Sequence, residues 1–180
     1  MKIPIQKWTC LLLVLCTLST LFAVPASASG YEAYAQTEHF TVMSVSTYPD
    51  MVINITVGEP TYQYGARLAG ASARFGVTHP VQITDGDGNL LLQRNLSFTI
   101  DGSAGSYSFS SPSEWEFYTT NMADGVLLGG ASNTRLSSTQ AQHSFTWYYY
   151  DAAFKTVVTF TLNKNTGTVA LSSITNTRTN

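Results

Sequence analysis

The chain has 180 residues, of which 44% are hydrophobic and 11% are charged, and its formal net charge is −2. A typical soluble domain has about 25% charged residues, so hydroxyl and amide side chains must supply much of the polar surface here. The few basic residues form no cluster, which argues against nucleic acid and anionic membranes as partners. The apolar content is too high for a disordered chain.

Residues 1–28 have the layout of a secretory signal peptide. Two lysines precede an apolar run from Cys10 to Val24, and a small-residue A-x-A triplet ends at Ala28. The apolar run is shorter than the roughly twenty residues that a membrane-spanning helix needs. We therefore expect cleavage after Ala28, secretion of residues 29–180 as one extracellular domain, and no stable membrane anchor after cleavage.

Cysteine usage limits the chemistry of the secreted part. Both cysteines, Cys10 and Cys16, lie within the predicted leader. The secreted chain would therefore have no disulfide, no cysteine zinc site and no thiol nucleophile. We expect a conventional hydrophobic core and no cofactor.

Alternation of apolar and polar residues recurs between turn signals about every ten residues, which predicts strands instead of helices. The first four strands are predicted near residues 39–46, 51–57, 62–68 and 77–84. Because proline has no backbone N–H, Pro80 predicts that the fourth strand is an edge strand or a bulged one.

The turn after the fourth strand, "DGDGN", begins like a calcium-binding loop. Asp85, Asp87 and Asn89 stand at alternating positions. An EF-hand loop then needs Gly at its sixth position and Glu at its twelfth, where this chain has Leu90 and Leu96. We interpret the segment as a hairpin turn of Asp, Gly and Asn, with no metal.

Residues 90–101 and 106–110 are predicted as the next two strands, with Asn95, Ser97 and Thr99 facing outward from the first of them. The segment Ser111–Asn121 fits two structures. Its first four residues, "SPSE", form a capping box typical of a helix start. Its later residues alternate, which favours a strand with Trp115, Phe117 and Thr119 on one face and Glu114, Glu116 and Tyr118 on the other.

The C-terminal third is predicted to end in a β-meander. A short strand within residues 123–133 is followed by a polar stretch, 134–142, that we interpret as an exposed connection. Three strands then follow, near residues 143–151, 155–163 and 168–174. About 8–10 short strands in one domain indicate an all-β fold, either an antiparallel β-sandwich of immunoglobulin-like architecture or a flattened barrel.

The sequence "HSFTWYYYD", residues 143–151, supplies the candidate ligand site. In a strand, Phe145, Trp147 and Tyr149 point to one face and Tyr148 and Tyr150 to the other. The first set belongs in the core, so the second faces outward. On the same outer face, the following strand places Val157 and Thr159.

These outward tyrosines have two interpretations. Packing between an aromatic and a β-branched residue across strands is common on exposed sheets. Alternatively, Tyr148, Tyr150, Val157 and Thr159 form a platform on which a sugar ring or peptide stacks.

No residue is predicted to be catalytic or to bind a metal. The chain has neither a G-x-S-x-G nor an H-E-x-x-H motif. Glu114 and Glu116 flank Trp115, and paired carboxylates beside an aromatic residue are found in glycoside hydrolases. Hydrolysis of a glycosidic bond by such a pair requires a surrounding cleft. The favoured function is non-enzymatic binding of an extracellular glycan, peptide or surface protein. A small secreted hydrolase and a membrane-active toxin remain the alternatives, and the oligomeric state stays open.

Overall fold

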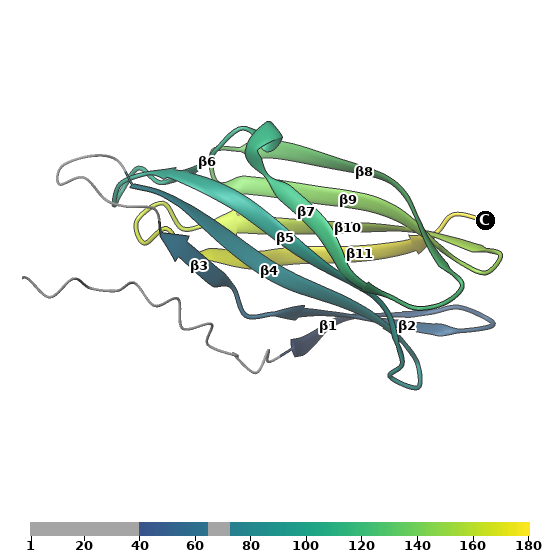
Figure 1. Ribbon diagram of the computed structural model, residues 1–180. Coiled ribbons are helices and arrows are strands. Elements are labelled where there is room, and N and C mark those ends of the chain that lie inside the picture. The colour runs from purple at the N-terminus through teal and green to yellow at the C-terminus, as the bar shows by residue number, and fades with distance from the viewer. Residues whose placement is uncertain (1–39, 65–72) are drawn as a thin grey trace, which may run out of the picture. The chain divides into compact units, whose positions relative to one another are not determined.

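The computed structural model describes residues 40–64 and 73–180, all within one compact unit of the chain. In these ranges it consists of two antiparallel β-sheets and a single 3-10 turn (Figure 1). The prediction of an all-β antiparallel fold is confirmed. No helix in the described ranges is long and apolar enough to cross a membrane. The predicted leader and residues 65–68 of the third predicted strand lie outside them.

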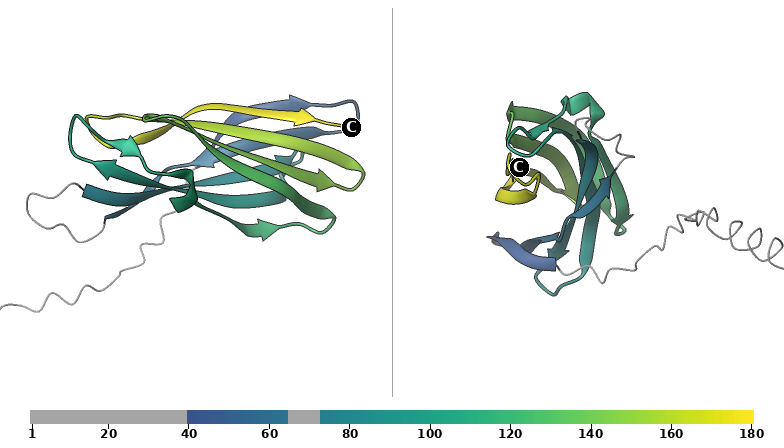
Figure 2. Two further views of the ribbon diagram at one scale, coloured as in Figure 1. Left: turned by 90° about the horizontal axis from the view of Figure 1, so that it is seen from above. Right: turned by 90° about the vertical axis from the view of Figure 1, so that its left-hand side faces the viewer.

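The first sheet has seven strands and curls into a half-barrel (Figure 2). Its hydrogen-bonded order is β1-β2-β4-β5-β6, with β3 beside β4 and β7 beside β5. The strands are β1 (Phe40–Thr47), β2 (Val52–Gly58), β3 (Thr61–Tyr64), β4 (Ala73–Asp85), β5 (Leu90–Gly102), β6 (Ser108–Phe109) and β7 (Glu116–Met122).

The second sheet has four strands in the order β11-β10-β9-β8, so each strand pairs with its neighbours in the sequence. The strands are β8 (Val126–Ser137), β9 (Gln140–Tyr149), β10 (Ala152–Leu162) and β11 (Val169–Arg178). The predicted C-terminal meander is confirmed as β9, β10 and β11. One edge of this sheet, β8, has no second neighbour among the described residues.

The core lies between the two sheets, where alternate residues of the strands point inward. Phe98 of β5 and Phe160 of β10 meet across the core with ring centroids 4.9 Å apart. Burying each such side chain stabilises the fold by about 1.5–3 kcal/mol. The predicted inward positions of these residues are confirmed, since they are at most 2% exposed: Leu96, Phe98, Ile100, Phe145, Trp147, Val158, Phe160 and Leu162. Tyr149, predicted with Phe145 and Trp147, is only partly buried at the edge of the core.

The predicted number of strands and one predicted connection are wrong. The described ranges contain eleven strands, where 8–10 were expected. The stretch 134–142 is not a connection, because β8 continues to Ser137 and turns directly into β9. Nearly every residue of β8 is exposed, on both of its faces. Because neither face of β8 is buried, its sequence has no alternation of apolar and polar residues, and the strand could not be predicted from such a pattern.

Pro80 lies in β4, which is a central strand and not the edge strand that was one of the two predictions. The register of β4 against β5 is irregular, as the other prediction allowed, but at Ile83–Thr84 and not at Pro80. Beside β4, the pairing with β2 ends at Val81 and the pairing with β3 starts at Thr78. Pro80 therefore falls in the gap between two short partners, where β4 has no neighbour on that side. The missing N–H costs no ladder hydrogen bond there.

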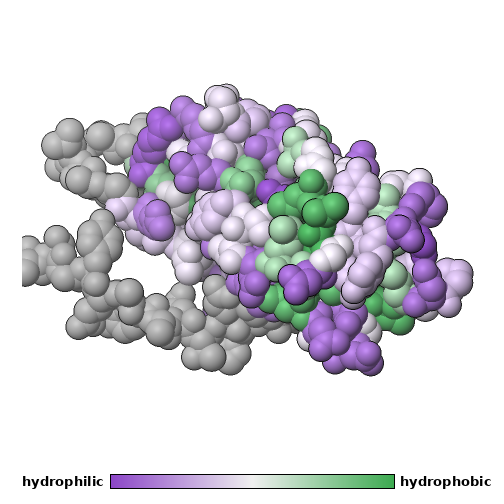
Figure 3. All heavy atoms as spheres, turned by 45° about the vertical axis from the view of Figure 1, so that its right-hand side comes forward, coloured by the Kyte–Doolittle hydropathy of each residue, from purple (hydrophilic) through white to green (hydrophobic). Residues whose placement is uncertain are grey.

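Apolar side chains are exposed on part of the surface. Figure 3, which brings the right-hand side of Figure 1 forward, shows apolar atoms gathered among hydrophilic ones. Large hydrophobic residues with substantial exposure include Leu127, Leu128 and Leu136 of β8 and Tyr148, which lies opposite Leu127 on β9. Met122 at the end of β7 and Tyr150 are exposed as well.

Candidate functional site

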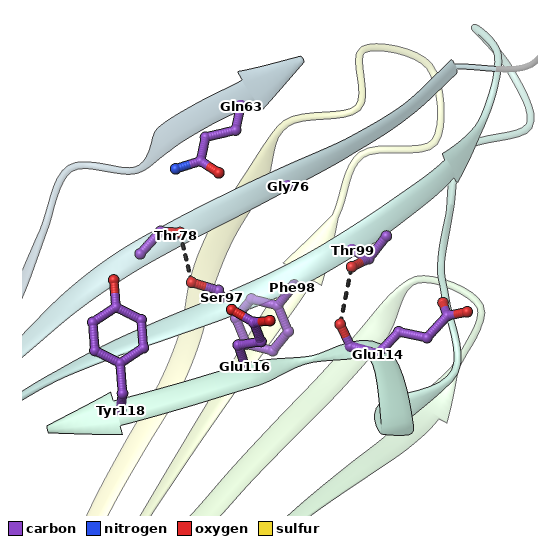
Figure 4. Close-up of a pocket in the computed structure, with 9 residues that line it drawn as sticks. All are labelled: Gln63, Gly76, Thr78, Ser97, Phe98, Thr99, Glu114, Glu116 and Tyr118. Atoms are coloured by element: carbon purple, nitrogen blue, oxygen red, sulfur yellow. Dashed lines mark hydrogen bonds between the residues drawn. The ribbon is translucent and has the colours of Figure 1, made fainter. Parts of the chain in front are cut away.

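A hollow of about 200 Å³ opens on the outer face of the first sheet (Figure 4). Strands β3, β4, β5 and β7 and the 3-10 turn before β7 all contribute to it. Its lining is mostly polar and consists of Gln63, Gly76, Thr78, Ser97, Phe98, Thr99, Glu114, Glu116 and Tyr118. A cavity of this size is below the range of about 300–1,000 Å³ that holds a drug-sized ligand, so it suits a single small ring.

The floor of the hollow is formed by outward-facing residues of β4 and β5. The hydroxyls of Thr78 and Ser97 hydrogen-bond to each other at 2.7 Å. The Thr99 hydroxyl donates to the backbone carbonyl of Glu114 at 3.1 Å. Gly76 has no side chain, so it leaves space above this part of the floor.

The wall on the β7 side carries an aromatic ring next to a carboxylate. Tyr118 is 49% exposed, and its hydroxyl accepts a hydrogen bond from the Asn95 amide at 3.2 Å. The Glu116 carboxylate points toward the middle of the hollow (Figure 4). Within the described part of the chain, it has neither a hydrogen bond nor an ion pair. It is therefore available to accept hydrogen bonds from a ligand.

Glu114, the second carboxylate of the lining, is held by a neighbouring cation. The Arg74 guanidinium contacts its Oε2 at 2.9 Å and lies 3.7 Å from the Asp101 carboxylate. The hydrogen bond from Arg74 keeps the pKa of the Glu114 carboxyl below its ordinary value. A glycosidase general acid requires a raised pKa, so this carboxylate is unsuited to that role.

The segment Ser111–Asn121, for which strand and helix were both open, positions this wall. Residues Pro112–Glu114 form one 3-10 turn, and β7 begins at Glu116. Trp115 is 6% exposed and packs on Phe98 with ring centroids 5.2 Å apart. This buried ring fixes the start of β7. Side chains alternate between the two faces of the strand, as predicted, so Glu116 and Tyr118 point outward.

The residues predicted as a ligand platform do not come together. Tyr148 is 40% exposed on the outer face of the second sheet, opposite Ala153. Val157 lies opposite Ser144 and Thr159 opposite Gln142, four and six residues farther along β9. A strand rises about 3.3 Å per residue, so Thr159 is about 20 Å from Tyr148 along the sheet.

Tyr150 lies in the turn after β9 and not in the strand itself. Its backbone has a positive φ of 50°, which is uncommon for a residue with a large side chain. Its ring lies over Gly125, where a Cβ atom would be 3.2 Å from it. The Tyr148 ring lies in the same way over Gly129, at 3.1 Å. Both tyrosines thus cover glycine backbone at one end of β8.

The turn "DGDGN" is held by its own side chains. The Asp85 carboxylate accepts hydrogen bonds from the backbone N–H groups of Asp87 and Asn89 at 3.0 and 2.8 Å, and from the Asn89 amide at 2.8 Å. These bonds account for the Asp-Asn pattern without a cation. In the described ranges, no group of three or more His, Cys, Asp and Glu residues is placed to hold a metal ion.

Part of the hollow was predictable from the sequence. Glu114 and Glu116 stood out as paired carboxylates beside Trp115, and Ser97 and Thr99 were predicted on an outer face. Gln63, Gly76, Thr78 and Tyr118, which complete the lining, were not predicted as site residues. The alternation around Trp115 was the one local signal that led toward Tyr118.

The described residues define a two-sheet antiparallel β-protein with a polar hollow on one outer face. Comparison of the chain with protein-family models, with curated proteins and with solved structures finds no match.

Proposed function

We propose that this protein is a secreted, non-enzymatic β-sandwich protein of immunoglobulin-like architecture that binds an extracellular glycan. The hollow on the outer face of the first sheet takes one neutral sugar ring. The observation that carries the proposal is the position of the Tyr118 ring beside the free carboxylate of Glu116, above a floor of hydroxyl groups.

The chemistry of the lining supports a sugar as the ligand. A sugar ring has an apolar C–H face and a rim of hydroxyl groups. Tyr118 offers an aromatic face for the first, and Glu116, Gln63 and the floor hydroxyls offer hydrogen-bonding groups for the second. Hydrogen bonds from hydroxyls to a carboxylate are among the stronger ones, because the acceptor is charged.

Charge and shape favour a neutral glycan over the other ligands considered. Glu116 would repel an anionic sugar, and the chain has more acidic than basic residues. An apolar peptide side chain would find few apolar partners, since Phe98 is the one large aliphatic or aromatic residue of the lining besides Tyr118. A hydroxyl-rich ring matches the lining better than either.

The proposal is tested by a glycan panel followed by calorimetric titration of the best neutral ligand. Glu116→Gln keeps the shape of the side chain but removes its charge, and Tyr118→Leu removes the aromatic face. A hydrogen bond to a charged group contributes about 1.5–3 kcal/mol and a neutral one about 0.5–1.5 kcal/mol, so we expect Glu116→Gln to weaken binding by about five- to ten-fold.

The matched control is Tyr148→Leu, because Tyr148 is a tyrosine of similar exposure on the other sheet. It should bind with wild-type affinity. The proposal is wrong if no neutral glycan binds, or if Tyr148→Leu loses binding while Glu116→Gln and Tyr118→Leu retain it.

A further inference from the structure

Strands β7 and β8 follow each other in the chain but belong to different sheets. In the described ranges, β7 pairs with β5 of the first sheet, and β8 pairs with β9 of the second. A turn at residues 123–125 joins the two strands at one end (Figure 1). Among these residues, no ladder of hydrogen bonds closes the boundary between the sheets along β7 and β8, which we call the seam.

The side chains that face the seam from its two edges are not fully covered. Residues opposite each other on paired strands share a face of the sheet. Met122 lies opposite the buried Leu92, and Leu128 lies opposite the buried Trp147, so both point toward the core side. They are nevertheless 44% and 37% exposed. The seam is therefore open to solvent here and has an apolar rim.

Arg94 of β5 is a buried cation beside this rim. It faces inward, opposite Thr119 of β7, and is 7% exposed. Its guanidinium lies over the Phe145 ring, 4.8 Å from the centroid. In the described part of the chain, Arg94 forms no ion pair, and its buried Nε has no hydrogen-bond partner. Arginine stays charged in proteins and buried charges are normally paired, so this cation is suited to binding an anion.

The neighbouring His143 supplies no negative charge to balance Arg94. It is 1% exposed and stacks on Phe117 of β7, with 4.1 Å between the ring centroids. Its Nδ1 lies 2.6 Å from Oδ1 of Asn133 and donates to it, because an amide oxygen accepts. Burial and the nearby Arg94 lower the pKa of His143 to about 3, so the ring is neutral. The guanidinium is therefore a single positive charge that no carboxylate of the described residues compensates.

The apolar rim lies close to this charge in both sheets. Phe117, which stacks on His143 of β9, lies opposite Leu96 on β5, and this contact aligns the two sheets across the core. In the same alignment Arg94 meets Phe145. The strand partners of the rim side chains then lie two residues farther along β5 and β9, or about 7 Å away. A short amphiphile can contact both the guanidinium and the rim.

We propose that the seam binds an aliphatic monocarboxylate, with its carboxylate on Arg94 and its hydrocarbon chain against Met122 and Leu128. The planar guanidinium matches the two oxygens of a carboxylate, and one negative charge balances one positive charge. A phosphate dianion would leave an unpaired charge in a buried position. Arg94 points to the opposite face of β5 from Ser97 and Thr99, so this site does not depend on the glycan hollow.

Calorimetric titration of the full chain with octanoate, acetate and octanol tests the proposal. Octanoate should bind best, because acetate lacks the hydrocarbon chain and octanol lacks the charge. Arg94→Met removes the charge but keeps an unbranched side chain, and we expect it to bind octanoate about ten-fold more weakly or worse. Replacing a buried, unpaired charge by an apolar side chain does not destabilise a protein, so the variant should resist urea as wild type does.

A second variant tests the rim independently of the charge. Leu128→Ser should weaken octanoate binding and leave acetate binding unchanged. Two controls should bind octanoate as wild type does: Arg135→Met, which removes an exposed arginine of β8, and Glu116→Gln, which alters the glycan hollow.

Several results would overturn the proposal. One is a wild-type protein that does not bind octanoate, or that binds acetate or octanol equally well. Another is an Arg94→Met variant that keeps wild-type affinity, or one that unfolds at clearly lower urea concentration, because the charge would then be compensated within the protein. Loss of octanoate binding in Arg135→Met would place the carboxylate elsewhere.

Discussion

At the scale of single residues, the core contains a polar chain that the hydrophobic pattern conceals. Trp147 and Thr156 are both fully buried. The Trp147 indole N–H donates to the Thr156 hydroxyl at 2.9 Å, and this hydroxyl donates to the Asn176 amide oxygen at 2.8 Å. Thr156 therefore satisfies two polar groups, one from β9 and one from β11, within the second sheet.

We predict that Thr156→Val destabilises the protein although it preserves the shape of the side chain. The indole N–H and the Asn176 amide oxygen both lose their partner, and an unsatisfied buried polar group costs about 1–3 kcal/mol. Urea unfolding should show a lower free energy of unfolding by at least this amount. Thr159→Val, on the outer face of the same strand, should change it little. Equal effects of the two substitutions would contradict the assignment.

Gly76 stands in the middle of β4, where glycine is not required by the backbone. Its φ is not in the left-handed region, and a Cβ atom would be 3.8 Å from the nearest side-chain atom, Gln63 Cβ. Glycine inside a strand costs about 0.5–1 kcal/mol relative to alanine. The space that it leaves open is the floor of the hollow.

Gly76→Ala is therefore predicted to raise stability and to weaken binding. The free energy of unfolding should increase by about 0.5–1 kcal/mol, and affinity for the glycan should fall because the methyl group enters the hollow. Gly130→Ala makes the same change in β8 and should leave glycan affinity unaltered. If Gly76→Ala binds as well as wild type, Gly76 does not shape the site.

At the scale of elements, sequence alternation predicted the strands that have one buried face. In β5, β9 and β10 the inward residues are mostly apolar, apart from Arg94, His143 and Thr156, so both the strand and its orientation could be predicted. Alternation failed for β8, which is exposed on both faces. It also failed at Pro80, because the gap between β2 and β3 that tolerates a proline depends on pairing between distant segments.

The 3-10 turn that carries Glu114 is tied to the first sheet by Arg74. This ion pair is exposed, and solvent screens exposed pairs, so they contribute little to stability. We predict that Arg74→Gln changes the free energy of unfolding very little. Its larger effect is on ionisation, because the hydrogen bond from Arg74 is the main cause of the lowered pKa of Glu114, with a smaller contribution from Ser110. An NMR titration should show this pKa rising toward its ordinary value, and an unchanged value would contradict the contact.

At the scale of the whole molecule, two buried histidines make stability depend on pH. Burial lowers the pKa of His79 to about 4, and burial together with the nearby Arg94 lowers that of His143 to about 3. In the unfolded chain a histidine has a pKa of about 6.5. As the pH falls through this value, the unfolded chain binds protons that the folded chain does not bind. Stability is therefore full above this pH and is lost as the pH falls below it.

When the pH is lowered from 7.5 to 5, each buried histidine should decrease the free energy of unfolding by about 2 kcal/mol. Most carboxylates stay ionised in this range, so they contribute little to the change. Urea unfolding at the two pH values measures the difference. His79→Leu should remove about half of it. A free energy of unfolding that is equal at pH 7.5 and pH 5 would contradict the burial of both rings.

The hollow is a property of the whole fold, which is why sequence analysis did not assemble it. Gln63, Gly76, Ser97 and Tyr118 are up to 55 residues apart in the chain. The register of β3 and β7 against β4 and β5 brings them together. The outward direction of Ser97 and Tyr118 could be predicted locally, but their neighbours could not, because no local pattern specifies pairing between distant strands.

The most direct test of the proposed function is an NMR titration of the isotope-labelled protein with the neutral glycan that binds best. We predict that the largest chemical-shift changes occur at Gly76, Ser97, Thr99 and Tyr118, on the outer face of the first sheet. Shift changes centred on Tyr148 and Tyr150 would place the ligand on the second sheet. That result would contradict the assignment of the hollow and restore the aromatic row as the binding site.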